Sequence, residues 1–101
     1  MASEKEHNYL SANIKAICDH LGISESQFMN SCDIDRSCLT RLKQGKTSWF
    51  STENMHKLGI FTHLLSDELL FDKPSEILRK FIERKDLTPR DYAHLYAMIS
   101  G

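Results

Sequence analysis

The chain has 101 residues, of which 41% are hydrophobic and 27% are charged, and its net charge is −1. Such a chain forms one domain, or one domain with a short appendage, and its composition excludes a disordered tail. No apolar run approaches the roughly 18 residues that cross a bilayer, and the polar start "MASEKEHNYL" lacks a signal-peptide core. We therefore expect a cytoplasmic protein without a membrane partner.

The first predicted helix lies between Leu10 and Leu21, where apolar residues recur at helical spacing and Gly22 follows as a C-terminal cap. A second, short helix begins after Ser24, because Ser24 and Gln27 form the pattern of a capping box. Its inward face is predicted to consist of Phe28, Met29 and Cys32.

A third helix begins at Asp35, a residue type that caps helices, and ends at Gly45. Leu39 and Leu42 are predicted to face inward from it. The sequence therefore predicts a helix, a tight turn and a second helix over residues 24–45.

Further helices follow along the chain, and no stretch alternates with the period of two that is typical of strands. Ser51 is a predicted N-cap, with Met55, Leu58 and either Leu64 or Leu65 inward, and a short helical turn begins at Ser66. Pro74 suits a first helical position. Its helix carries the apolar stripe Ile77, Leu78, Phe81 and Ile82. Thr88 and Pro89 predict the start of a last helix with the stripe Tyr92, Leu95, Tyr96 and Ile99. The chain is predicted to be all-α.

Positive charge is concentrated in one short segment of the chain. Residues 35–50 hold four basic side chains and one acid, a net charge of +3, whereas residues 1–34 carry −3. The basic residues are Arg36, Arg41, Lys43 and Lys46. A charged run can be an ordinary solvated face, so charge alone does not decide its role.

Residues 13–70 resemble the Cro/CI-type (XRE-like) helix-turn-helix domain. The resemblance rests on the polar pair Ser24-Glu25, the pair Phe28-Met29, the turn Cys32-Asp33-Ile34, the polar helix 35–44 and the closing Gly45-Lys46. The chain departs from the family where Glu25 replaces a frequent glutamine, Met29 a small residue and Asp33 a glycine. The resemblance implies a five-helix domain over residues 8–71, followed by a C-terminal two-helix extension over 72–101.

The resemblance also implies a sequence-specific DNA-binding transcriptional regulator of the repressor type that reads operator half-sites through the helix at 36–44. The first turns of such a helix point into the major groove, where arginine can bond guanine O6 and N7. The predicted base contacts are Arg36, Ser37 and Arg41. The predicted contacts to the DNA backbone are Ser24, Thr40, Lys43, Gln44, Lys46, Thr47 and Ser48.

The C-terminal hairpin has more apolar surface than two helices bury between themselves. One interpretation is a homodimer that matches a palindromic operator on double-stranded DNA, with an interface of Ile77, Phe81, Tyr92, Leu95, Tyr96 and Ile99. The other interpretation is a hairpin that packs wholly on its own domain. A second functional hypothesis is a protein-interaction helix-turn-helix module, such as an antitoxin or a regulator adaptor, with a protein partner.

The sequence contains no recognisable catalytic or metal-binding pattern. The five histidines show no metal spacing, and no nucleophile triad, carboxylate pair or glycine-rich phosphate loop can be read. Three cysteines without a CxxC pair are expected to be reduced core residues. We expect no enzymatic activity, no metal and no cofactor, and we expect Trp49, Phe50 or both in the core.

Overall fold

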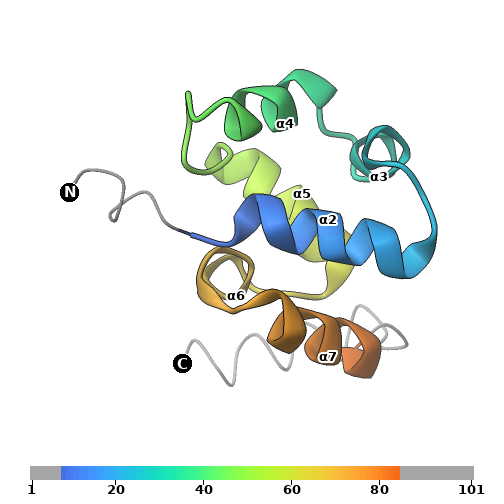
Figure 1. Ribbon diagram of the computed structural model, residues 1–101. Helices are drawn as coiled ribbons and strands as arrows, with labels where there is room; N and C mark the ends of the chain where they lie inside the picture. The colour runs from blue at the N-terminus through green and yellow to red at the C-terminus, as the bar shows by residue number, and fades with distance from the viewer. Residues whose placement is uncertain (1–7, 85–101) are drawn as a thin grey trace.

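The computed structural model describes residues 8–84. Within this range it contains six helices and no strand, so the all-α prediction is confirmed. The helices are α2 (Leu10–Leu21), α3 (Glu25–Ser31), α4 (Arg36–Lys43), α5 (Thr52–Thr62), α6 (Ser66–Phe71) and α7 (Pro74–Arg84). Figure 1 shows α2 in the middle, with α3 and α4 on one side of it and α6 and α7 on the opposite side. The predicted last helix lies outside the described residues.

The helix starts follow the capping residues that the sequence offers. The hydroxyl of Ser24 accepts from the Gln27 amide while the Gln27 side chain accepts from the Ser24 amide, which completes the capping box. Asp35 accepts from the Ser37 amide at 2.9 Å and Ser51 accepts from the Asn54 amide at 3.2 Å. These predicted boundaries are therefore confirmed, because each depends only on neighbours within one helical turn.

A tight turn joins α3 to α4. Asp33 has a φ of 61°, in the left-handed region that costs most L-residues about 1–2 kcal/mol but is tolerated by aspartate. The amide of Ile34 then donates to the Met29 carbonyl at 3.0 Å, and the Ile34 side chain is buried. The Lys57 ammonium donates to the Asp33 carbonyl at 2.9 Å. The turn is therefore held from the core and from α5.

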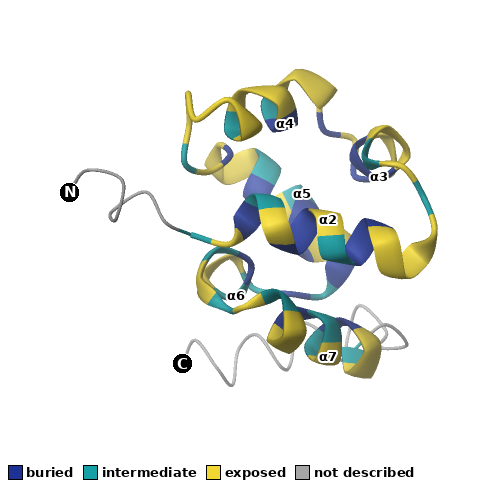
Figure 2. Cartoon of the chain, viewed as in Figure 1, coloured by how far each residue is buried: buried dark blue, intermediate teal, exposed yellow. Residues whose placement is uncertain are grey.

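One hydrophobic core connects all six helices, as the buried surfaces that face the centre of Figure 2 show. Helix α2 contributes Leu10, Ile14 and Ile17, which are fully buried. From α3, the Phe28 ring meets Phe61 of α5 edge-on, with ring centroids 5.4 Å apart. The other buried apolar residues are Cys18, Met29, Cys32, Ile34, Leu39, Phe50, Met55, Leu58, Leu64, Leu69, Ile77 and Phe81.

Helix α7 packs against α2 as part of this same core. Ile77 is fully buried and Phe81 is 5% exposed, so neither is available to a second copy. Their assignment to a dimer interface is corrected accordingly. Ile82, which belongs to the predicted apolar stripe of this helix, is 46% exposed. The core is therefore continuous across the predicted division between residues 71 and 72. The remaining predicted interface residues, Tyr92, Leu95, Tyr96 and Ile99, lie outside the described residues.

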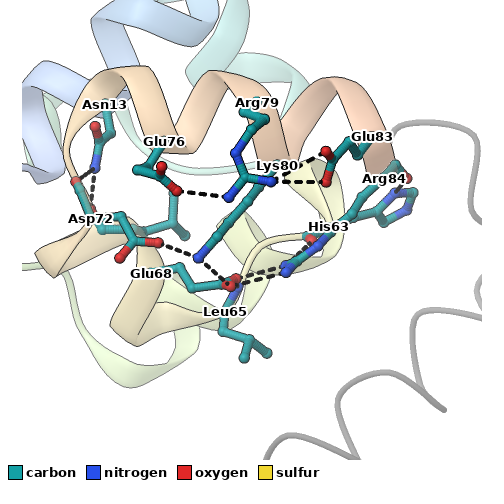
Figure 3. A network of polar contacts seen from close by, with 11 residues as sticks. Asn13, His63, Leu65, Glu68, Asp72, Glu76, Arg79, Lys80, Glu83 and Arg84 are labelled. Atoms are coloured by element: carbon teal, nitrogen blue, oxygen red, sulfur yellow. Dashed lines mark hydrogen bonds and ion pairs between the residues drawn. The ribbon is translucent and has the colours of Figure 1, made fainter.

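Polar contacts fix α6 to α7 (Figure 3). The Arg84 guanidinium donates to both carboxylate oxygens of Glu68, at 2.7 and 3.0 Å, and Lys80 joins Glu68 at 3.1 Å and Asp72 at 2.6 Å. Burial alone would raise the pKa of Glu68. Hydrogen bonds from Arg84, the Leu65 amide and Lys80 outweigh that effect and hold the pKa below its usual value. Glu68 is therefore ionised in this largely buried site.

Helix α5 ends at Thr62, two residues before Leu64, where its predicted inward stripe was expected to continue. His63 has a φ of 60° and terminates α5 as a left-handed cap, so Leu64 enters the core from the connection and not from the helix.

A buried asparagine joins α2 to α6. The Asn13 side chain of α2 donates to the carbonyls of Leu69 and Asp72, at 2.8 and 3.0 Å. These hydrogen bonds tie α2 to α6 and to Asp72, the residue that follows α6.

Candidate nucleic-acid interface

Helix α4 is amphipathic and lies at the edge of the molecule. Leu39 is 3% exposed and Leu42 packs partly buried against the core. Figure 2 shows that the opposite side of α4 is exposed. The three predicted base-contact residues, Arg36, Ser37 and Arg41, are all exposed there. The structure therefore brings these three side chains to one outward surface.

Neighbouring side chains orient both arginines. Arg36 donates from Nη1 to the Ser26 hydroxyl of α3 at 3.2 Å, and Arg41 donates from Nη1 to the Ser37 hydroxyl at 3.4 Å. A guanidinium has five N–H donors, so each arginine retains donors for a ligand. Ser26 was not predicted, because a contact across ten residues and a turn leaves no periodic signal in the sequence. Arg36 also lines a surface depression of about 490 Å³ between α3 and α4.

Most of the predicted backbone-contact residues lie at the C-terminal end of α4 or just beyond it, whereas Thr40 lies within α4 and Ser24 at the start of α3. Ser24 serves as the cap of α3, and the Thr40 hydroxyl donates to the Arg36 carbonyl at 3.4 Å. Gln44, Lys46 and Thr47 are exposed, whereas Ser48 is half-buried. The Ser48 carbonyl accepts a hydrogen bond from the Asn8 side chain at 2.8 Å. The residues that follow α4 therefore form a rim beside the predicted base-contact surface.

Lys43 differs from the other predicted phosphate contacts because it forms an ion pair with Glu25 of α3. The second carboxylate oxygen of Glu25 is buried and has no hydrogen-bond partner among the described residues. The positive charge of Lys43 is thus offset by a carboxylate 18 positions earlier in the chain. The sequence pattern singled out Glu25 as a departure, but only the fold reveals that it neutralises a cation of α4.

Asp35 adds a second negative charge to this surface. The Ser37 amide and hydroxyl bond its carboxylate and hold the pKa of Asp35 below its usual value, with smaller contributions from Arg41 and Arg36. Asp35 is therefore ionised at neutral pH. The surface built from α4, its cap Asp35, Glu25 and Lys46 carries four cations and two carboxylates, a net charge of +2.

Trp49 and Phe50 follow α4 and point to different environments. Phe50 is 4% exposed and belongs to the core, which confirms the prediction that at least one of the pair is buried. Trp49 is 60% exposed.

Cys18 and Cys32 are the buried cysteines between residues 8 and 84. Burial raises the pKa of Cys18 to about 11 and of Cys32 to about 12, so both thiols are protonated at neutral pH. Within the described range, no group of three or more histidine, cysteine, aspartate or glutamate side chains could hold a metal ion. In the same range, no helix is long and apolar enough to span a membrane.

Comparisons with protein-family models, with curated proteins and with solved structures found no match.

Proposed function

We propose that this protein is a cytoplasmic, non-catalytic, sequence-specific DNA-binding regulator that acts as a repressor and reads operator half-sites through α4. The observation that carries the proposal is the outward surface of α4. It combines two arginines and a serine with a buried leucine on the other side of the same short helix. A surface of this kind offers donors to the acceptor-rich edge of guanine in the major groove.

The arrangement of α3, the turn at Asp33 and α4 supports a helix-turn-helix of the Cro/CI type. Helix α3 is capped by Ser24 at the end where such domains approach the phosphate backbone, and the turn places Ile34 in the core. Lys46 and Thr47 are exposed just beyond α4. In the proposed complex these residues contact phosphates and set the register, while α4 contacts bases.

We further propose that two copies bind a palindromic operator, one on each half-site. A single α4 of eight residues reads only a few base pairs, so a two-fold arrangement increases the length of sequence that is recognised. The modest net charge of +2 on the α4 surface supports weak non-specific binding. Affinity would therefore depend on base contacts and on the pairing of two copies.

Selection of bound duplexes from a random DNA pool tests this proposal. We expect a palindromic consensus whose half-site spacing is close to one helical turn or a multiple of it. Arg41→Ala should lose about 1–3 kcal/mol of discrimination at one base pair. Arg79→Ala, which removes an exposed arginine from α7, is the matched control and should leave the consensus unchanged. Recovery of no consensus would refute sequence-specific binding.

Lys46→Ala tests the predicted phosphate contact separately. It should weaken binding to every sequence to about the same extent and reduce the salt slope by about 1. A change that affects only some sequences would contradict this assignment.

A protein-interaction module is the second candidate, and the Glu25–Lys43 ion pair favours it. The charges of Glu25 and Lys43, two of the six charged groups on the α4 surface, cancel each other. A protein partner would tolerate this loss of positive charge more easily than a phosphate backbone would. In that case a purified partner would bind stoichiometrically, while DNA binding would be no tighter than about 10⁻⁴ M.

A further inference from the structure

An apolar groove of about 1020 Å³ lies between α5 and α6. Its lining runs from Trp49, before α5, to Phe71, at the end of α6. Among the described residues that line it, none is Asp, Glu, Lys or Arg, although the chain is 27% charged. We name this feature the α5–α6 groove.

Large apolar side chains are exposed along the α5–α6 groove. Trp49 is 60% exposed, Ile60 55% and Phe71 65%. Apolar side chains gathered along a groove in this way offer a place where another segment or molecule can pack. The absence of charge from the described lining indicates an apolar occupant and not a nucleic acid or a charged peptide.

The described part of the chain ends beside the α5–α6 groove. The carbonyl of Arg84, the last described residue, lies 2.8 Å from Nδ1 of His63, and the Arg84 guanidinium donates to the His63 carbonyl at 3.3 Å. His63 itself lines the α5–α6 groove. The seventeen residues that follow Arg84 in the sequence therefore start beside the groove.

These following residues include the apolar stripe of Tyr92, Leu95, Tyr96 and Ile99, whose spacing is that of one helix face. The connection over residues 85–91 can span up to about 25 Å when extended. It is therefore long enough to bring the stripe to the α5–α6 groove of the same chain.

We propose that the segment of residues 88–100 packs its apolar stripe into the α5–α6 groove of its own chain. A short tether gives a segment an effective concentration in the millimolar range, which exceeds the concentration of a second copy under ordinary conditions. This proposal assigns the four stripe residues to an intramolecular contact and not to the dimer interface predicted from sequence. It does not depend on DNA binding.

Trp49 is the only tryptophan of the chain and lines the groove, so its fluorescence reports the occupant directly. In the full-length protein we expect blue-shifted emission with weak acrylamide quenching, both independent of protein concentration. Leu95→Asp places a charge on the stripe and should cause a red shift and stronger quenching. His94→Asp adds the same charge on the opposite side of the predicted helix and is the matched control, with emission like the wild type.

A second variant approaches the contact from the groove. Ile60 is largely exposed, so Ile60→Asp should leave the far-ultraviolet circular dichroism of the folded domain unchanged while producing the same red shift. A synthetic peptide of residues 88–100 should reverse the red shift of Leu95→Asp. It should leave the wild type unchanged up to about 1 mM, because the tethered segment already fills the groove.

Two results would overturn the proposal. Equal emission from the wild type, Leu95→Asp and His94→Asp would mean that the segment does not cover Trp49. A wild-type blue shift that disappears on dilution, together with dissociation into monomers in sedimentation, would show that a second copy occupies the groove.

Discussion

The ion pair between Glu25 and Lys43 leads to a prediction in which removal of an acid strengthens DNA binding. Glu25→Gln keeps the shape of the side chain but removes its charge, so Lys43 becomes able to neutralise a phosphate. The two side chains are 27% and 45% exposed, and a surface ion pair of this kind contributes about 0–1 kcal/mol to folding. The fold should therefore survive the substitution.

The expected gain follows from counterion release. Each additional phosphate contact steepens the plot of log binding constant against log salt concentration by about 0.9. Between 1 M and 0.1 M salt, one contact therefore changes the binding constant about eightfold. We expect Glu25→Gln to bind a random-sequence duplex about eightfold more tightly than the wild type at 0.1 M salt.

Fluorescence anisotropy with a labelled duplex, repeated over a salt series, measures both the affinity and the slope. Glu83→Gln is the matched control: it removes the same charge from an exposed position on α7, on the side of the molecule away from α4 (Figure 1). Lys43→Ala added to Glu25→Gln should return the slope to its original value. The reasoning is refuted if Glu25→Gln leaves the slope unchanged, or if Glu83→Gln changes it equally.

Three further predictions concern stability. Ile77→Ala should lower the free energy of unfolding by about 2–5 kcal/mol because Ile77 is fully buried. Ile82→Ala, at a 46% exposed position, should lower it by less than about 1 kcal/mol; equal losses in thermal denaturation would contradict the position of α7. Glu68→Gln should cost about 1–3 kcal/mol at pH 7. Because the folded-state pKa of Glu68 is lowered, its contribution is present above the unfolded value of about 4.3 and is lost as pH falls through the folded value. Urea denaturation should therefore show the variant and the wild type converging as the pH falls below that unfolded value, and a constant difference would argue against the network. Asp33→Gly should be more stable than Asp33→Ala by about 1 kcal/mol, because only glycine adopts a φ of 61° without strain; the reverse order in urea denaturation would contradict the left-handed turn.

Helix starts and the turn before α4 could be predicted from the sequence alone. Ser24, Asp35, Ser51 and Pro74 all stand where the structure begins a helix or places its cap. Such signals are local, because a cap bonds amides two or three residues away, and its effect does not depend on the rest of the fold. The same holds for Asp33, whose residue type tolerates the left-handed turn.

Burial and pairing, by contrast, were decided by the tertiary structure. The sequence gives Ile77 and Ile82 the same apolar character, yet only Ile77 is buried, and only Phe50 of the pair Trp49-Phe50 reaches the core. The basic segment likewise contained no sign that Glu25 would pair with Lys43. These outcomes depend on residues that are distant in sequence and become neighbours only when the helices pack. Composition and periodicity therefore determined which residues could form the core and the α4 surface, and packing selected those that do.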